Sequence, residues 1–435
     1  MSQKDNSLTR RRFLGATAAG VAGVTVVGSR SVLGMIEGAN ERVNVGVVGT
    51  GSEGGGLIRQ LATQPNAKIT ALCDIFDPNL QRCLRIAGGQ PATFTDYRKV
   101  IDSKDVDAVV IATPLHLHSE IALAALAASK HVYVEKTMAY SAIQCEQMVR
   151  SVKAHPSLVL QVGHQRRYGP MIRRSIEMAR DGAIGKITHI RCNWHRNGSW
   201  RRPVPKNNFD PRPWGYADLE HLVNWRMYKK YSGGLMCELG AHMIEITNVI
   251  LGAAPVAVTG FGGIDFWKDG RETLDNVVVV FNYPEGQKVI FSSITTNAHY
   301  GERIQVMGTE GTIDMSWDQA LYFRETENNS EALVKSEEAT VITSTGETMP
   351  ASPKGGAGQG TEVRPQARGR ANPTYLSLEA FINCIRESKR PEVDVEVGRN
   401  AAVSVLMANQ AIEQGRVVKF AEVASPAKRP AARKG

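Results

Sequence analysis

The sequence lacks any close pairing of cysteines. Its 435 residues include six cysteines, and these form neither a CxxC pair nor a spacing typical of a metal site. Such spacing is the main sequence sign of structural zinc or of a redox-active disulfide, so neither is predicted. Because most of these cysteines sit within apolar runs, we expect buried thiols. They are Cys73, Cys83, Cys145, Cys192, Cys237 and Cys384.

A hydrophobic run long enough to span a bilayer is also missing. The apolar stretch at residues 16–27 has 12 residues and is rich in glycine and alanine, whereas a transmembrane helix needs about 20 apolar residues. It follows TRRRFL at residues 9–14. Paired arginines, Phe-Leu and a mildly apolar segment resemble a twin-arginine export signal, which predicts an exported, periplasmic protein and the twin-arginine export machinery as a partner. A disordered basic arm is the alternative, and no clean small-x-small cleavage site lies between residues 29 and 40.

The central part of the chain lacks excess charge. The formal net charge of +9 would suit nucleic acid, but residues 1–40 carry five bases against two acids, and the last eleven residues carry four bases and no acid. The part between them is nearly neutral, so nucleic-acid binding is not predicted. With 42% hydrophobic and 22% charged residues, the chain is typical of a globular protein, and its length predicts two domains.

A glycine-rich turn follows the first apolar strand. Residues 43–48, VNVGVV, predict a strand, and GTGSEG then leads into a helical pattern that reaches Leu61. Strand, GxGxxG and helix in this order form the dinucleotide fingerprint. The first glycine permits the tight turn, the second lets the backbone approach a pyrophosphate, and the third lets the helix pack on the strand. The predicted cofactor-binding residues of this turn are Gly49, Thr50, Gly51, Ser52, Glu53 and Gly54.

A carboxylate closes the second predicted strand. KITALCD ends at Asp74, 25 residues after Gly49. There it could accept hydrogen bonds from the ribose hydroxyls of NAD and repel the 2′-phosphate of NADP, so NAD is favoured and NADP stays open. The alternative is a capping or turn acid before Asp77 and Pro78.

Alternating strand and helix patterns continue to about residue 163. They predict an α/β Rossmann domain, a doubly wound parallel sheet whose ligand lies at the carboxyl ends of the strands. Polar clusters stand at three such ends, at residues 113–118, 135–136 and 164–168. From these clusters the predicted cofactor-binding residues are Thr113, Pro114, His118, Glu135, Lys136 and Arg166.

After about residue 185 the pattern changes to period-2 or continuous apolar segments separated by turns. This predicts an α+β domain with a large, mostly antiparallel sheet, interrupted by one helix over residues 234–251. The predicted boundaries are 1–40 for a signal and linker, 41–165 for the Rossmann domain, 166–325 for the sheet domain, 326–372 for a mobile excursion, 373–420 for C-terminal helices and 421–435 for a disordered basic tail.

The interrupting helix carries candidate acid/base residues. Glu238 and His242 are four apart, with Glu245 three further on, so on an α-helix the three share a face. A carboxylate beside an imidazole can orient a general base. A surface Glu-His pair and a Glu/His/Glu metal site are the alternatives.

Several motifs occur in a characteristic order along the chain. They are GTGSEG, ATPLHLH, VYVEK, GHQRRYGPMIRRS with DGAIGKI, and SGGLMCELGAHMIEI. Together they resemble the Gfo/Idh/MocA oxidoreductases over about residues 43–325, and the end of the chain is similar to that family too. The resemblance implies NAD(P), substrates among sugars, cyclitols or their derivatives, and subunits paired through the open sheet face. It also implies that Lys136 lies near the nicotinamide and that His242 and Glu238 complete the acid/base group.

Two positions depart from the family pattern. Thr137 replaces the proline that usually follows the lysine, which removes any cis preference at that bond. Glu238 replaces the usual aspartate. In the predicted mechanism, Lys136 exchanges a proton with a substrate hydroxyl as hydride moves to the cofactor. His242, steered by Glu238, is the alternative base, and Tyr168 donates to a substrate hydroxyl.

Three readings of the function stay open at this point. The first is an NAD(P)-dependent oxidoreductase acting on a CH-OH group, with Trp194, Trp200 and Trp225 as sugar-stacking walls or packing residues. The second is a glycosidase that oxidises its sugar transiently, and the third is a non-catalytic sensor. Because twin-arginine transport carries folded proteins, an exported enzyme of this type would have to load its cofactor first and hold it tightly.

Overall fold

The computed structural model describes residues 42–317, 319–325, 340–342, 348–350, 360–364 and 372–424. The predicted export signal, most of the 326–372 excursion and residues 425–435 of the predicted tail lie outside these ranges. The first residues of that predicted tail belong instead to a short helix, α13 (Phe420–Ala424). Within the described ranges, no helix combines the length and the apolar character needed to cross a membrane.

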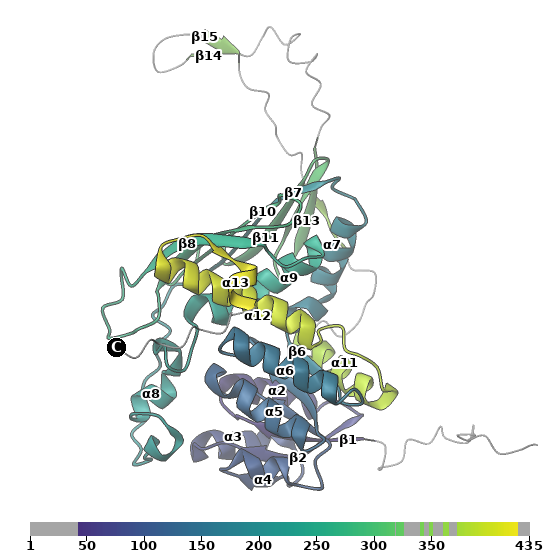
Figure 1. Ribbon diagram of the computed structural model, residues 1–435, viewed down its shortest axis with the longest axis vertical. Coiled ribbons are helices and arrows are strands. Elements are labelled where there is room, and N and C mark those ends of the chain that lie inside the picture. Colours follow the sequence, from purple (N-terminus) through teal and green to yellow (C-terminus); the bar gives the residue numbers. More distant parts are fainter. Residues whose placement is uncertain are drawn as a thin grey trace, which may run out of the picture. The chain divides into compact units, whose positions relative to one another are not determined.

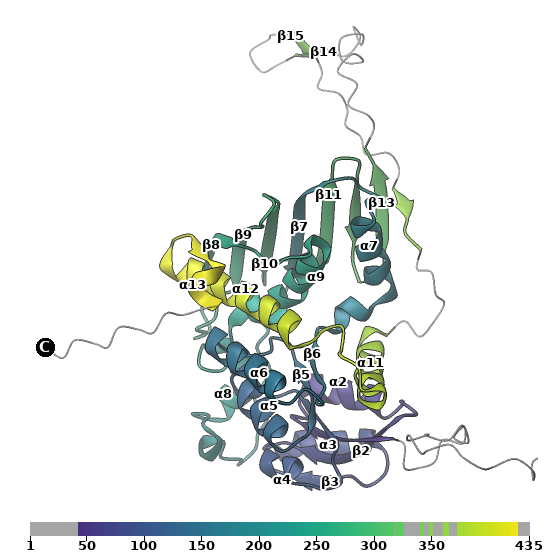
Figure 2. The same cartoon turned by 45° about the vertical axis from the view of Figure 1, so that its right-hand side comes forward.

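The first part of the described chain forms a six-stranded parallel sheet (Figures 1 and 2). Its order is β3-β2-β1-β4-β5-β6, and every neighbouring pair is parallel. The order reverses beside β1, so the crevice for a ligand lies at the carboxyl ends of β1 and β4. The predicted doubly wound Rossmann sheet is confirmed. The strands are β1 (Val43–Val48), β2 (Ala67–Cys73), β3 (Ala92–Phe94), β4 (Ala108–Ile111), β5 (His131–Glu135) and β6 (Leu160–Gly163).

Helices cover both faces of this sheet, because most of its strand residues are apolar and buried. One of them comes from the far end of the chain: Phe381 packs its ring edge-on against Tyr133 of β5, at 5.6 Å between centroids. The helices are α2 (Ser52–Leu61), α3 (Asp77–Ala87), α4 (Tyr97–Ile101), α5 (His118–Ala127), α6 (Ala142–Ala154) and α11 (Pro373–Glu387).

The second part is built on a nine-stranded sheet, in the order β16-β13-β12-β11-β7-β10-β9-β8-β17. Only β7 and β10 run parallel to each other; the other neighbours are antiparallel. The predicted large, mostly antiparallel sheet is therefore confirmed. Its strands are β7 (Ile187–His195), β8 (Ala257–Gly263), β9 (Asn276–Asn282), β10 (Lys288–Ile294), β11 (Glu302–Gly308), β12 (Gly311–Met315), β13 (Ala320–Arg324), β16 (Thr361–Glu362) and β17 (Val418–Lys419). A separate hairpin pairs β14 (Thr340–Ile342) with β15 (Thr348–Pro350).

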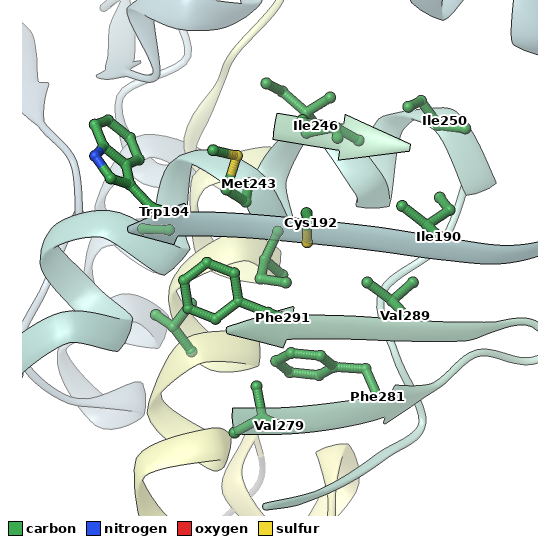
Figure 3. Packing of buried hydrophobic residues seen from close by; sticks show 14 of the residues in the cluster. Ile190, Cys192, Trp194, Met243, Ile246, Ile250, Val279, Phe281, Val289 and Phe291 are labelled. Carbon is green, nitrogen blue, oxygen red and sulfur yellow. The ribbon is translucent and has the colours of Figure 1, made fainter. Parts of the chain in front are cut away.

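One face of the large sheet packs against α7 (Pro170–Arg180), α9 (Ala241–Leu251) and α12 (Val395–Gln414). Alternate strand residues point into this layer, as the two-residue period of a strand requires. Figure 3 shows Cys192 of β7 and Phe291 of β10 beside Met243 and Ile246 of α9. Trp194 lies at the end of this row, next to the polar residues described below. All six cysteines are free thiols, and five are buried, as expected.

Candidate active site

The three glycines of the turn between β1 and α2 meet different surroundings. Gly49 has φ +89°, and a Cβ there would lie 2.6 Å from the backbone of Ala112. A Cβ on Gly54 would lie 1.9 Å from the carbonyl oxygen of Gly49, so the helix can pack this close only without a side chain. A Cβ on Gly51 would meet nothing within 4 Å. The protein itself requires the first and third glycines, whereas the second faces open space that a ligand can enter.

Asp74 braces this turn. Its Oδ2 accepts hydrogen bonds from the backbone nitrogen and hydroxyl of Thr50, at 2.8 and 2.9 Å, and its Oδ1 accepts one from the nitrogen of Phe76. Burial raises the pKa of Asp74 even though these hydrogen bonds oppose the shift. The alternative prediction, that Asp74 caps or stabilises a turn, therefore describes part of its role. Because Oδ2 already accepts two hydrogen bonds, a ribose hydroxyl would have to bond to Oδ1, and this contact stays a prediction.

The other turn residues are placed around the same opening. Ser52 begins α2, after Gly51 as its N-cap. Glu53 accepts a hydrogen bond from the Gln165 side chain at 3.3 Å, which links the turn to the end of β6. Arg82 of α3 was not predicted: it donates to the carbonyl oxygens of Thr50 and Gly51, at 2.8 and 3.0 Å.

His118 ties two strand ends together. Its Nδ1 lies 2.8 Å from the carbonyl oxygen of Thr137, and its Nε2 lies 2.9 Å from that of Thr113. The ring is buried, and both nitrogens face backbone oxygens. The structure therefore gives His118 a tethering role in place of the cofactor contact predicted from sequence. Pro114 precedes the short helix η1 (Leu115–Leu117) on the same loop.

Lys136 and Thr137 are held by one turn of the chain. The Nζ of Lys136 donates to the carbonyl oxygen of Glu238 at 2.9 Å and lies 4.0 Å from that residue's carboxylate. The hydroxyl of Thr137 donates to the carbonyl oxygen of Cys237 at 2.8 Å. The peptide bond between Lys136 and Thr137 is cis, although threonine lacks the cis preference of proline.

The turn that receives these contacts is η5 (Met236–Gly240), a π-helical turn directly before α9. Such turns insert an extra residue and occur often at functional sites. Glu238 lies within this turn, and His242 belongs to the first turn of α9. No hydrogen bond joins these two side chains in the described part of the chain. The prediction that Glu238 steers His242 was therefore wrong.

Glu238 is paired with Arg226 instead. The Nε of Arg226 donates to its carboxylate at 3.0 Å, and the hydroxyl of Ser232 donates at 3.3 Å. Burial raises the pKa of Glu238, but Arg226 and Lys136 outweigh burial and hold it below its usual value. Arg226 also stacks over Trp225 at 4.2 Å and lies 5.7 Å from the ring of Trp200. These two tryptophans thus pack against an arginine that the sequence prediction missed.

Two buried imidazoles face Lys136. The rings of His164 and His242 are 6.4 Å apart, and Lys136 contributes to the electrostatic shift of both. Burial, reinforced by neighbouring positive groups, lowers the pKa of His164 to about 3 and that of His242 well below its usual value. Both rings are therefore neutral at physiological pH. His164 was not among the predicted site residues, although it directly follows β6.

An aromatic row continues from His242. Its ring lies 5.4 Å from Trp194, which lies 5.5 Å from Trp317. The guanidinium of Arg166 stacks over Trp317 at 4.8 Å. Trp317 lies outside every predicted motif, and only the antiparallel sheet brings it here. Trp194 packs in the core and also borders the site, so it is compatible with both interpretations given from sequence, a packing residue and a sugar-stacking wall.

The remaining predicted residues lie elsewhere. Tyr168 is buried beneath Arg173, and its hydroxyl has no partner among the described residues, so its donation to a substrate hydroxyl stays a prediction. Glu245 forms a buried ion pair with Arg167 at 2.8 Å. In the described ranges, no group of three acidic, histidine or cysteine side chains could hold a metal, so the Glu/His/Glu alternative fails.

Glu135 is buried, and burial raises its pKa well above its usual value.

Two regions of the chain match the two domains of one known protein family. Residues 43–164 match the NAD-binding Rossmann domain of an oxidoreductase family, and residues 176–420 match the C-terminal alpha/beta domain of the same family. Among curated relatives, the chain is 27% identical over 286 residues to 2,7-anhydro-N-acetylneuraminate hydratase of Escherichia coli, covering 64% of this chain and 68% of that protein. It is 23% identical over 387 residues to myo-inositol 2-dehydrogenase of Thermotoga maritima, covering 88% and 99%.

The fold also matches solved structures. Levoglucosan dehydrogenase in complex with NADH superimposes with a TM-score of 0.67 at 20% identity, covering 87% of this chain and 99% of that one. The second family match alone covers more than half of the chain. Together with the glycine turn and the two sheets, these matches establish that the chain belongs to the Gfo/Idh/MocA family of NAD-binding oxidoreductases.

Proposed function

We propose that this protein oxidises a secondary hydroxyl group of a sugar, a cyclitol or a related compound. The observation that carries the proposal is the position of Lys136, whose Nζ donates to the carbonyl oxygen of Glu238 and lies close to two neutral imidazoles. Polyhydroxylated rings are named as substrates of the relatives, which supports this substrate class.

The crevice fits NAD. Gly51 leaves open space at the turn, and the buried Oγ1 of Thr113 and Oε1 of Glu135 have no partner within the described residues. These atoms at the ends of β4 and β5 would hold the nicotinamide half, and residues 49–54 would hold the pyrophosphate. When bound, NAD supplies the hydride acceptor.

The chain's own residues handle the proton. Lys136 takes the hydroxyl proton as the C–H bond breaks, and the carboxylate of Glu238, 4.0 Å away, stabilises the resulting ammonium group. His242 is the alternative base because its ring is neutral and buried. The row formed by His242, Trp194 and Trp317 gives an apolar wall on which a sugar ring can pack.

A direct test uses the purified full chain. Denaturation followed by mass spectrometry identifies the dinucleotide that copurifies. The native protein is then mixed with a panel of neutral and acidic sugars and cyclitols, and reduced nicotinamide is followed by its absorbance. Reduction with at least one panel member is expected. Absence of reduction with every member, despite bound NAD, would contradict the proposal.

A redox-neutral glycosidase is the second candidate. The E. coli relative is named a hydratase, and water addition involves no net oxidation. Transient oxidation, elimination, water addition and return of the hydride would use the same lysine and histidines. Incubation with chromogenic glycosides and no added NAD separates the two functions, because aglycone release would occur only in the glycosidase.

Removing the positive charge of Arg226 should shift the pH profile. This guanidinium holds the pKa of Glu238 low, so Arg226→Gln should raise that pKa, and activity should then fall at a higher pH during acidification. We expect the acid limb of kcat/KM to move upward by about one pH unit or more, whereas Arg226→Lys should move it much less. An acid limb that stays in place in Arg226→Gln would show that Glu238 does not govern this limb.

We propose that residues 1–40 direct export to the periplasm by the twin-arginine route. Replacing Arg10, Arg11 and Arg12 together by lysine preserves the charge but removes the paired arginines, so the precursor should accumulate in the cytoplasm. Cell fractionation measures this, with Arg30→Lys as the control. Unchanged export of the triple variant would favour the plain basic arm.

We also propose that the protein forms a homo-oligomer through the second face of the large sheet. Phe261 of β8 and Val278 of β9 are cross-strand partners there, and both are exposed, at 84% and 48%. Neighbouring exposed apolar side chains favour burial against another surface.

A further inference from the structure

A long connection between β7 and the π-helical turn runs alongside the parallel sheet. The helices in residues 196–232 are all short, and one of them is α8 (Leu219–Val223). In Figures 1 and 2, α8 is drawn at about the same height as α3 and α5 of the parallel-sheet domain. The ring of Phe209 packs against Phe76 at 5.6 Å. Tyr216 and Tyr231 share a buried cluster with Ile75. Because Ile75 and Phe76 directly follow Asp74, this connection reaches the end of the crevice where the adenosine would lie.

The same connection reaches the opposite end of the crevice. Arg226 binds the carboxylate of Glu238, which in turn lies beside Lys136. Tyr140, four residues after Lys136, donates its hydroxyl to the carbonyl oxygen of Lys229. One continuous segment is therefore attached at both ends of the path that a bound dinucleotide follows.

Arg202 belongs to the same connection and has no counter-charge among the described residues. Its backbone is fixed by Asn224, which accepts from its nitrogen at 2.7 Å and donates to its oxygen at 2.9 Å. Its guanidinium forms no hydrogen bond or ion pair with any described residue. The preceding Arg201, by contrast, is paired with Glu220 and Asp269.

Three other arginines act electrostatically on Arg202. Although the side chain reaches solvent, the surrounding protein and the charges of Arg226, Arg82 and Arg196 lower the pKa of Arg202, and no carboxylate opposes the shift. Arg82 in turn holds the carbonyl oxygens of Thr50 and Gly51. Positive charges without a carboxylate partner, close to the open space beside Gly51, favour the binding of an anion.

We infer that Arg202, together with Arg82, binds the diphosphate of the dinucleotide from the side opposite the glycine turn, so that residues 196–232 clamp the cofactor in its crevice. The guanidinium and the backbone N–H groups of the turn would then share the negative charge of the diphosphate. This inference rests on the proposed function only in requiring a bound dinucleotide, and it does not depend on the sugar.

The test compares Arg202→Gln and Arg202→Lys with the wild type. The matched control is Arg59→Gln, which removes an equally positive, exposed arginine from the other end of α2. Binding of NADH, ADP-ribose and adenosine is measured on protein freed of copurified cofactor, and the half-time for release of NADH is measured separately. Thermal unfolding of each variant confirms that it folds.

In Arg202→Gln we expect about 10- to 30-fold weaker binding of NADH and ADP-ribose, because a charged hydrogen bond to phosphate is lost. Release of NADH should quicken by a similar factor. Adenosine binding should not change, because adenosine has no phosphate, and Arg202→Lys should be intermediate.

Two results would overturn the inference. One is NADH affinity in Arg202→Gln within twofold of that in Arg59→Gln. The other is unchanged NADH affinity with a raised KM for an acidic sugar, which would assign the anion to the substrate. If no sugar is oxidised but NADH binding weakens as expected, the clamp stands and the proposed function fails.

Discussion

Replacing Lys136 by methionine should lower kcat by about a thousandfold while NADH binding stays within a few-fold of the wild type. Methionine has nearly the same length but no proton to exchange, and general acid/base groups commonly contribute a factor of this size. The Nζ of Lys136 is fixed by the carbonyl oxygen of Glu238, so the wild-type enzyme holds this group in one position. Stopped-flow reduction of bound NAD with a confirmed substrate measures the effect.

The matched control for this prediction is Lys68→Met, which changes an exposed lysine of β2. It should leave kcat unchanged. If Lys136→Met retains normal turnover and His242→Ala abolishes it, His242 is the base and Lys136 has only a structural role.

Replacing Gly54 by alanine should destabilise the protein by about 3 kcal/mol, because its Cβ would lie 1.9 Å from the carbonyl oxygen of Gly49. Both partners are backbone, so the whole of α2 would have to shift away from β1. NAD binding should fall with it, since the turn would lose its geometry. Urea-induced unfolding gives the change in free energy.

Two further glycines of the same helix start serve as controls. Gly56→Ala meets nothing within 4 Å and should stabilise the helix by up to about 1 kcal/mol. Gly51→Ala should fold like the wild type, because it also meets nothing, but bind NADH weakly. Equal stability of Gly54→Ala and Gly56→Ala would show that α2 does not need the close contact.

The turn and both sheets could be predicted because their signals are local. The strand at residues 43–48, the glycine spacing and the change from βα alternation to period-2 segments each fit within short windows of sequence. The separate tasks of Gly49, Gly51 and Gly54 follow from the same few residues, and the surroundings of each glycine agree with them.

The partners of the acid/base residues could not be predicted, because they depend on contacts with other segments of the chain. Glu238, in the π-helical turn at residues 236–240, is bonded to Arg226 and not to His242. Arg226 comes from a connection with no regular periodicity. Tyr168 directly follows residues at the site, yet a short 3-10 helix, η2 (Gln165–Tyr168), turns it into the core.

The position of α11 determines when the nucleotide-binding half can finish folding. Ser377 of this helix accepts a hydrogen bond from Gln161 of β6 at 2.8 Å and lies 3.2 Å from the hydroxyl of Tyr133. More than 200 residues separate these partners in the chain. During synthesis, the part of the parallel sheet around Tyr133 and Gln161 therefore stays uncovered until nearly the whole polypeptide has left the ribosome, and completion of that half is a post-translational event.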